Sequence, residues 1–362
     1  MKRVVIIGAA GYVGLELANQ LRGSNFEVNA VTRENGKFLL RNSGFNVVVP
    51  SDIGSVGEAD VVVNLAHPTS GPPQQYPARN KEILDQIKAT TGPRSRLIHV
   101  STQAVFGNDL DRPIHAGPVP MVRDFPYNEA KIELENMVLD EFGSKSVQIL
   151  RLGNVWGPGS PTWTVTFINK ILFGEPVGIE SLDGYCNATD VANVASYLHF
   201  LINSDHLLGA HFYHLAEMSE HRWSEWVHKI ESALSQEAVL VPDFPNDPDS
   251  LRDEVREALS PLRPEQLYRN LATRRISGSR IRGLIRGMGQ QRFERAKKRY
   301  GRAFPSGYAL GPSEKIFLKL VSCQTQFKTQ VLEQWEPPID FGKSWSNVED
   351  WMSDAGYTLC AR

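Results

Sequence analysis

Two side chains four residues apart, Tyr127 and Lys131 in the segment YNEAK, have the types and the spacing needed for proton transfer. Residues at positions i and i+4 share one helix face. A lysine ammonium beside a phenol favours the phenolate and lowers the pKa of the phenol. We therefore expect Tyr127 to act as a general acid and base near neutral pH. A Tyr-x-x-x-Lys pair alone is usually a solvated helix face, so this interpretation depends on the rest of the chain.

Hydroxyl side chains precede this pair in the segment STQAVFG, residues 101–107, directly after the apolar run RLIHV. Thr102 is suited to hydrogen-bond a substrate hydroxyl that loses or gains a proton. The interval from these hydroxyls to Tyr127 makes the combination more specific than either motif by itself.

Three glycines near the N-terminus, Gly8, Gly11 and Gly14, lie three residues apart after the apolar run VVII. Such a turn between a strand and a helix lets the backbone approach a pyrophosphate, and the helix N-terminus supplies positive potential. The alternative is a glycine turn that serves packing alone. The hydroxyls and the Tyr127–Lys131 pair downstream favour the dinucleotide interpretation.

The elements that must position these residues alternate between strand and helix. Apolar runs predict strands at residues 4–7, 26–31, 46–49, 60–65, 96–100 and 147–152, and helical spacing predicts helices at 12–21, 81–88 and 128–141. This alternation predicts an α/β fold with a Rossmann-type doubly wound parallel sheet in residues 1–155, to which parts of 185–215 return. Residues 156–362, richer in glycine, proline and aromatic residues at their start, are expected to form a smaller C-terminal substrate-binding region.

The composition limits the function classes. A formal net charge of −2 over 362 residues gives no global field that attracts nucleic acid. The three cysteines show no disulfide framework or metal-ligand spacing, so we predict no metal site and a reducing compartment. The first apolar run is too short for a signal peptide and no run reaches a membrane span, so we expect a cytoplasmic protein.

The ordered set of motifs resembles the extended short-chain dehydrogenase/reductase family, in its NAD-dependent epimerase/dehydratase branch that acts on nucleotide sugars. The resemblance covers residues 1 to about 240 and a segment near the C-terminus. It rests on GAAGYVG, NLAH, VSTQAVFG, YNEAK with Glu135 further along, LRLGNVWGPG, NATDVA, GAHFYHLA and PPIDFGKSWSNVEDWM. NATDVA departs from the Val-Asp-Asp-Val-Ala form of the family.

The resemblance implies roles for individual residues. Tyr127 is the expected catalytic base, Lys131 contacts the nicotinamide ribose and tunes Tyr127, and Thr102 is the third catalytic residue. Asn64 is expected to line the cofactor channel. The remaining expected cofactor-binding residues are Gly8, Gly11, Tyr12, Val13, Gly14, Thr32, Arg33, Asp52, Ile53, Leu65, Ala66 and His67. The expected substrate-binding residues are Ser101, which is also the second choice for the catalytic hydroxyl, Gln103 and Asn154; a turn role for Asn154 is the alternative.

The end of the second predicted strand bears on the choice between NAD and NADP. NAD users commonly carry an acid there for the ribose 2′-hydroxyl, whereas this chain has Thr32 and Arg33. A guanidinium suits phosphate geometry, so the sequence favours NADP. The alternative is NAD, with Arg33 solvated or stacked on the adenine.

The residues after Thr102 bear on the reaction. The 4,6-dehydratases of the resembled family carry an acidic pair there, and this chain has Gln103 and Ala104. We therefore expect hydride transfer at a sugar carbon, with epimerisation through a transient ketone placed slightly ahead of an NADPH-dependent keto-sugar reductase. A non-catalytic NADP-sensing regulator is the alternative from another class.

A basic helical insertion at about 245–335 exceeds the family pattern. Residues 263–302 contain thirteen Lys or Arg and two Glu. We expect this insertion to cap the substrate pocket or mediate oligomerisation, with a homodimer as the expected assembly. Alternatives are arginine contacts to the substrate diphosphate and peripheral contact with an anionic membrane. Nucleic acid is not an expected partner because motif support is absent.

Overall fold

The computed structural model describes residues 1–41, 43–68, 72–107, 126–180, 183–204, 208–241 and 312–357, the last from residue 317 onward with side chains. The chain divides into two compact units. Unit 1 comprises Met1–Trp156, Asn187–Glu220 and Thr325–Phe341, and unit 2 comprises Gly157–Cys186, His221–Gln324 and Gly342–Arg362. Most of the basic insertion, residues 245–311, lies outside the described residues.

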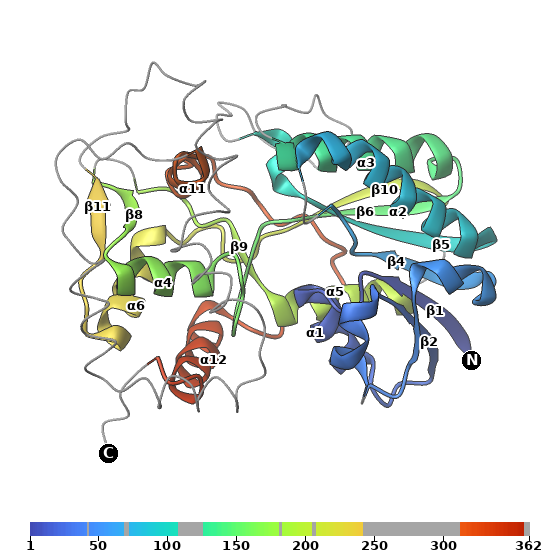
Figure 1. The fold of residues 1–362 in the computed structure, drawn as a ribbon, viewed down its shortest axis with the longest axis horizontal. Coiled ribbons are helices and arrows are strands. Elements are labelled where there is room, and N and C mark those ends of the chain that lie inside the picture. The colour runs from blue at the N-terminus through green and yellow to red at the C-terminus, as the bar shows by residue number, and fades with distance from the viewer. Residues whose placement is uncertain are drawn as a thin grey trace. The chain divides into compact units, whose positions relative to one another are not determined.

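Unit 1 is built on a seven-stranded sheet in which every neighbouring pair is parallel. The order across the sheet is β10-β6-β5-β4-β1-β2-β3 (Figure 1). The strands are β1 (Lys2–Ile7), β2 (Phe26–Val31), β3 (Asn46–Val48), β4 (Ala59–Asn64), β5 (Thr91–Thr102), β6 (Ser146–Leu152) and β10 (Gly209–Leu215). The predicted Rossmann-type sheet is confirmed, and β5 begins five residues earlier than the apolar run 96–100 predicted.

Two helix layers cover this sheet. Helix α1 (Tyr12–Leu21) packs against α5 (Val191–Asn203), and α2 (Tyr76–Thr90) packs against α3 (Pro126–Phe142). Among the residues that the structure describes, the connections contain four 3-10 turns: η1 (Glu34–Leu40), η2 (Pro50–Ser55), η3 (Pro73–Gln75) and η4 (Gln103–Phe106). The short strands β7 (Asn154–Trp156) and β9 (Ala188–Asp190) pair in parallel.

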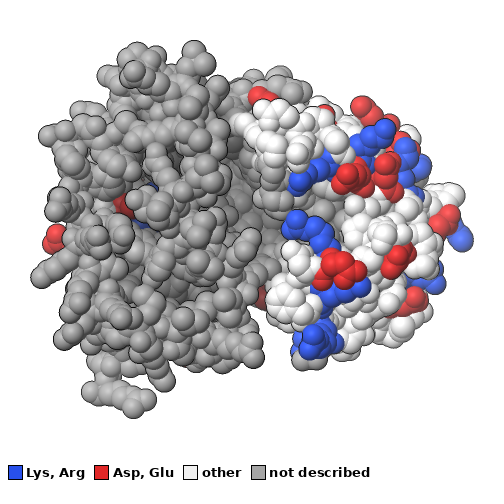
Figure 2. Space-filling model, viewed as in Figure 1, with Lys and Arg blue, Asp and Glu red and all other residues white. Residues whose placement is uncertain are grey.

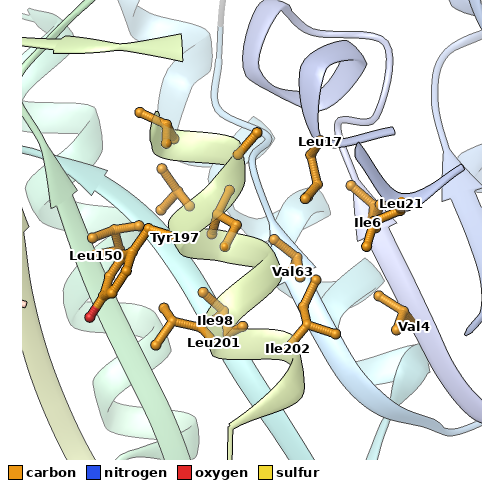
Figure 3. Close-up of a cluster of buried hydrophobic side chains, with 14 of the residues drawn as sticks. Val4, Ile6, Leu17, Leu21, Val63, Ile98, Leu150, Tyr197, Leu201 and Ile202 are labelled. Carbon is orange, nitrogen blue, oxygen red and sulfur yellow. The ribbon is translucent and has the colours of Figure 1, made fainter. Parts of the chain in front are cut away.

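Unit 1 has a hydrophobic cluster on each face of the sheet, because successive apolar side chains of a strand such as β1 point to opposite faces. Val4 and Ile6 of β1 belong to the cluster that includes Leu17 of α1 and Leu201 of α5 (Figure 3). Their neighbours on β1, such as Val5, belong to the other cluster, which includes residues of α2 and α3. Successive side chains of a strand face opposite sides, so a strand buried on both faces is a continuous apolar run.

Residues 325–341, which we grouped by sequence with the C-terminal region, make their contacts in unit 1. Gln330 exchanges both backbone hydrogen bonds with His214 of β10. Trp335 is 8% exposed, lies 4.9 Å from the ring of Tyr197 and donates from Nε1 to the Ser196 hydroxyl at 3.1 Å. This segment therefore covers the β10 edge of the sheet and part of α5.

Unit 2 has its own aromatic core. The elements described in this unit are α4 (Thr164–Phe173), β8 (Pro176–Ile179), α6 (Trp223–Leu234), β11 (Val239–Val241), α11 (Pro312–Val321) and α12 (Phe341–Asp354, from residue 342 onward). Phe167 is fully buried and stacks on Trp223 with ring centroids 4.9 Å apart. Trp163 stacks on Trp223 at 4.8 Å, so the rings hold α4 and α6 together.

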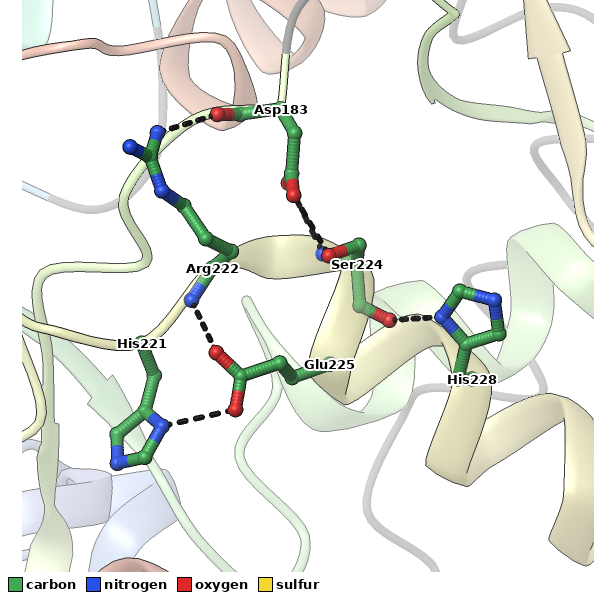
Figure 4. Close-up of polar contacts among 6 residues, drawn as sticks. All are labelled: Asp183, His221, Arg222, Ser224, Glu225 and His228. Carbon is green, nitrogen blue, oxygen red and sulfur yellow. Dashed lines mark hydrogen bonds and ion pairs between the residues drawn. The ribbon is translucent and has the colours of Figure 1, made fainter.

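A polar network fixes the start of α6 (Figure 4). Asp183 accepts from the backbone N–H of Ser224 at 3.1 Å and from its hydroxyl at 2.6 Å. Arg222 donates to the Asp183 carbonyl at 2.6 Å, and Glu225 accepts from the Arg222 backbone N–H at 2.9 Å. His221 lies 2.9 Å from Glu225. These bonds satisfy donors that a helix start leaves unpaired, so we assign the network a structural role.

Charge is mixed on the described surface. Figure 2 shows Lys and Arg interspersed with Asp and Glu over the visible face of unit 1. None of the described helices is long and apolar enough to cross a membrane.

Candidate active site

The glycine turn joins β1 to α1 with the geometry of a phosphate cradle. Gly8 has φ +88°, and its amide and that of Ala9 donate to the Val31 carbonyl at 3.0 and 3.1 Å. Gly11 is the N-cap of α1, which has no side-chain cap and no acidic residue in its first turn. Free backbone donors at a helix N-terminus without a competing acid favour a bound anion.

This turn lies at the point where the strand order reverses. Strand β1 pairs with β2 on one side and with β4 on the other, and ligands of open α/β sheets bind outside the strand ends at such a point. A Cβ on Gly8 would lie 2.9 Å from the Ala66 nitrogen after β4. A Cβ on Gly14 would lie 2.6 Å from the carbonyl oxygens of Gly8 and Ala9. The residues present therefore fit a dinucleotide pyrophosphate.

Tyr127 lies with residues from two neighbouring strand ends. Its side chain hydrogen-bonds the side chain of Thr102 at the end of β5, and this bond lowers the pKa of the phenol. The imidazole of His67, after β4, packs edge-on against the Tyr127 ring with centroids 5.6 Å apart at 80°. The structure thus brings together Thr102 and Tyr127 as the sequence predicted.

Lys131 lies one helical turn further along α3 and is 4% exposed. Its Nζ donates to the Val100 carbonyl of β5 at 3.2 Å. Burial lowers the pKa of Lys131 to about 8, and the charge of Glu135 opposes that shift. A lysine with this pKa changes its charge close to physiological pH.

Two histidines beside Lys131 are held neutral. Burial and the charge of Lys131 lower the pKa of His67 to about 3 and that of His99 to about 3. Nδ1 of His99 lies 3.0 Å from Nδ2 of Asn64, whose Oδ1 accepts from the Ala66 N–H at 3.1 Å. These histidines therefore add no charge near Tyr127 above acidic pH.

One expectation about Tyr127 was wrong in direction. We expected the neighbouring ammonium to lower the pKa of the phenol, but the pKa of Tyr127 is raised. Tyr127 as a whole is 37% exposed, but desolvation around the phenol, which penalises the phenolate, outweighs the hydrogen bond from Thr102 that favours it. Tyr127 is consequently a protonated phenol in this structure, the form that acts as a general acid.

The turn η4 after β5 is fixed by hydrogen bonds from its own residues and from α3. The Ala104 N–H donates to Thr102 Oγ1 at 3.2 Å, and Asn128 Nδ2 donates to the Ala104 carbonyl at 2.9 Å. The Ser101 hydroxyl and both amide atoms of Gln103 are buried with no hydrogen-bond partner among the described residues. Buried polar groups normally have a partner, so these two predicted substrate-binding residues retain unused hydrogen-bonding capacity.

The predicted cofactor-binding residues after β2 and β3, which are Thr32, Arg33, Asp52 and Ile53, have contrasting environments. Thr32 is 8% exposed, whereas Arg33 is exposed. The Thr32 hydroxyl packs against Gly36, where an added Cβ would lie only 2.3 Å away. Asp52 is exposed in η2, and Ile53 is buried in the sheet core. Arg33 and Asp52 therefore present side chains to solvent at this edge, and Thr32 and Ile53 pack inward.

The other predicted residues lie at the ends of strands. Tyr12 and Val13 begin α1, with the Tyr12 hydroxyl 3.5 Å from the Trp156 carbonyl, and burial raises the pKa of Tyr12. The Leu65 N–H donates to the Ile7 carbonyl at 2.8 Å, which ties β4 to β1. Asn154 begins β7, where its N–H donates to the Asn187 carbonyl at 2.8 Å. This backbone bond is compatible both with substrate binding by the Asn154 side chain and with the alternative role in a turn.

Sequence reasoning assigned no role to Arg151 of β6 or to the two phenylalanines that enclose it, Phe106 and Phe212. Both partners of Arg151's ion pair stand in quoted motifs, Arg151 in LRLGNVWGPG and Glu135 after YNEAK. Their contact depends on the packing of α3 on β6, which the motifs do not specify. Among the described residues no group of three or more His, Cys, Asp or Glu is placed to hold a metal ion.

The fold and this site define a dinucleotide-binding protein with a tyrosine–lysine pair beside the strand ends. The chain belongs to the NAD dependent epimerase/dehydratase family, whose model matches residues 4–213. It is 27% identical over 175 residues to UDP-glucuronic acid decarboxylase 1 of Arabidopsis thaliana, a match covering 43% of this chain and 40% of that relative.

Two solved structures share the fold. The dTDP-glucose 4,6-dehydratase of Bacillus anthracis in complex with NAD matches with a TM-score of 0.54 and 15% identity, over 67% of this chain and 85% of that one. The UDP-glucose 4-epimerase of Bifidobacterium longum in complex with NAD+ and UDP matches with a TM-score of 0.53 and 17% identity, over 68% and 88%.

Proposed function

We propose that this protein is an NAD(P)-dependent enzyme that transfers hydride at a carbon of a nucleotide sugar, and that its reaction is epimerisation through a transient ketone. The observation that carries the proposal is the hydrogen bond between Thr102 and Tyr127 with Lys131 buried one turn away. Family membership and the glycine turn at the strand-order reversal support the cofactor.

In this proposal each residue has a defined task. As the phenolate, Tyr127 takes the proton from the reacting sugar hydroxyl, and as the phenol it returns the proton to the ketone oxygen; Thr102 hydrogen-bonds the same oxygen. Lys131 supplies positive charge that favours the phenolate during the proton transfer. A bound dinucleotide would supply the hydride acceptor and donor through its nicotinamide, and the turn of Gly8, Gly11 and Gly14 at the N-terminus of α1 would hold its pyrophosphate.

The choice of reaction rests on the residues after Thr102. Elimination of water from a sugar calls for acid or base groups beyond the tyrosine, and this chain has the neutral Gln103 and Ala104 there. The relatives include a decarboxylase and the fold neighbours a dehydratase and an epimerase. Gln103 and Ala104 favour epimerisation over dehydration.

A second candidate is an NADPH-dependent keto-sugar reductase. Arg33 is exposed two residues after the end of β2, where its guanidinium can face a 2′-phosphate, and neither Thr32 nor Arg33 is an acid. The expected NADP preference, the homodimer, the cytoplasmic location and the contact of the basic segment with an anionic membrane all stay predictions. The non-catalytic regulator is disfavoured because Thr102, Tyr127 and Lys131 are all present.

The test begins with mass spectrometry of small molecules retained through purification, followed by incubation with UDP- and dTDP-sugars. Tightly retained NAD supports epimerisation, and exchangeable NADPH with net ketone reduction supports the reductase. The Tyr127→Phe variant should keep cofactor affinity and lose at least about 100-fold in hydride transfer. Tyr76→Phe, at the start of α2, is the matched control. Full activity of Tyr127→Phe would overturn the assignment of the base.

A further inference from the structure

A buried ion pair joins the helix of Tyr127 and Lys131 to strand β6. Glu135 lies one turn after Lys131 on α3, Arg151 lies near the end of β6, and both side chains have no exposed surface. Nε of Arg151 lies 3.2 Å from Oε1 and 3.3 Å from Oε2 of Glu135, and Nη2 also donates to Oε1. Two guanidinium nitrogens therefore hold one carboxylate, the geometry for which arginine is suited.

Two aromatic rings enclose the guanidinium of this pair. The Arg151 guanidinium carbon lies 4.9 Å from the ring centroid of Phe106 and 4.9 Å from that of Phe212. Phe106 ends η4, the turn that begins directly after Thr102, and Phe212 belongs to β10. Guanidinium–ring contacts are attractive and orient both partners. Arg151 thus contacts both the catalytic helix and the turn after the catalytic hydroxyl.

Stability alone does not account for this arrangement. Removing two charges from water opposes folding, and apolar residues of similar volume often replace a buried ion pair without loss. The pair therefore calls for a role that an apolar pair does not perform.

The surroundings of Lys131 indicate such a role. In the described part of the chain, the titratable and charged groups near it are His67 after β4, His99 of β5, Tyr127 and Glu135 of α3, and beyond Glu135 the guanidinium of Arg151 on β6. Both histidines are neutral above acidic pH and Tyr127 is protonated. Glu135 is the group whose charge favours the ammonium of Lys131.

We propose that the Glu135–Arg151 pair is a positioning unit for the catalytic pair: Arg151 holds the Glu135 carboxylate one turn from Lys131, where it keeps the lysine charged, and through Phe106 it fixes the turn that follows Thr102. Tyr127, Lys131 and Glu135 are spaced four residues apart on α3, so one helix face carries the phenol, the ammonium and the carboxylate in sequence. The inference rests on the proposed function of Tyr127 and Lys131.

The experiment compares two double variants. Glu135→Leu with Arg151→Met replaces the buried pair by apolar side chains of similar volume. Lys88→Met with Glu141→Leu removes a matched pair that also ties α3 to a neighbour, at 2.6 Å but with side chains 46% and 36% exposed. Glu135→Gln, which keeps the side-chain volume and an acceptor for Arg151, is the second test of the same charge.

Two readouts are measured on the full chain. The first is the titration of the Lys131 Nζ, followed by NMR of ¹⁵N-lysine-labelled protein without substrate and assigned with Lys131→Arg. The second is the pH profile of hydride transfer. In both Glu135 variants we expect the midpoint of the Lys131 titration to move down by about one pH unit, and the limb of the activity profile that follows Lys131 to move with it. A shift of this size changes the charged fraction of Lys131 about tenfold at pH values above the midpoint. The Lys88/Glu141 variant should leave both unchanged.

The outcomes separate the two proposals. An unshifted Lys131 titration in a folded Glu135 variant overturns the positioning role, because a merely structural pair would leave the lysine unchanged. If the wild-type protein shows no hydride transfer but the Lys131 titration still moves down in the Glu135 variants, the positioning role stands and the proposed function is contradicted. If both Glu135 variants fail to fold, a wild-type Lys131 that titrates like a free lysine overturns the inference, because it shows no buried charge for Glu135 to support.

Discussion

The third glycine of the N-terminal turn gives the sharpest prediction about the fold. A Cβ on Gly14 would lie 2.6 Å from the carbonyl oxygens of Gly8 and Ala9, and both neighbours are backbone. The Gly8 carbonyl also accepts from the Gly11 N–H at 2.9 Å, so it cannot move without opening the turn. We therefore expect Gly14→Ala to destabilise the protein even without cofactor.

The magnitude follows from two opposing effects. Alanine in place of glycine inside a helix stabilises by about 1 kcal/mol. Overpacking costs about 3 kcal/mol at the upper end of its usual range, which suits contacts with backbone, so the net loss is about 2 kcal/mol. For a unit of this size 1 kcal/mol moves Tm by about 2–4 °C. We expect Tm to fall by about 4–8 °C.

The assay is thermal unfolding followed by circular dichroism on cofactor-free protein, with calorimetric titration of NAD and NADP. Gly54→Ala is the matched control, because its Cβ would meet nothing within 4 Å; its stability should change by less than about 0.5 kcal/mol. Gly11→Ala meets the Gly8 carbonyl at 3.2 Å and should chiefly weaken cofactor binding. A Gly14→Ala protein with wild-type Tm would refute the packing argument.

Three further outcomes follow. Burial lowers the pKa of His99 to about 3, so its contribution to stability is present above about pH 6.5 and lost as the pH falls toward 3; His99→Gln should flatten the fall in urea-unfolding midpoint between pH 7 and 5. Trp335→Ala removes the ring that packs on Tyr197 and should cost about 3–5 kcal/mol in urea unfolding, with Trp335→Phe losing less. Arg33→Ser should weaken NADP binding about tenfold or more in calorimetry and leave NAD nearly unchanged; equal losses for both cofactors would contradict a 2′-phosphate contact.

The sequence predicted the parts of unit 1 whose signal is local. Strand β1 is a run of buried β-branched residues ended by Gly8, and α1 begins at Tyr12 as its spacing indicated. The segment 325–341 has no such periodicity, because partners far away in the chain, such as Gln330 for His214, fix its course. Its place in unit 1 was therefore not predictable from pattern alone.

The candidate site shows the same division. Spacing was enough to bring Thr102, Tyr127 and Lys131 together, since each stands at a strand end or on one helix face. The direction of the Tyr127 pKa was wrong because burial depends on the packing around the phenol, which a helix face does not specify. Arg151 was missed because only the register of β6 against α3 reveals its carboxylate partner.

The two pKa shifts at the site together explain why a buried carboxylate behind Lys131 matters. Burial favours the neutral amine of Lys131 and the protonated phenol of Tyr127, so both shifts oppose the charged pair that proton transfer requires. Glu135 acts against the first shift directly, and against the second through the lysine charge it maintains. The hydrogen bond of Thr102, at the end of β5, opposes the second shift. A carboxylate on α3 and a neutral hydroxyl at the end of β5 therefore both favour the charged pair, and loss of either group should raise the pH needed to ionise Tyr127.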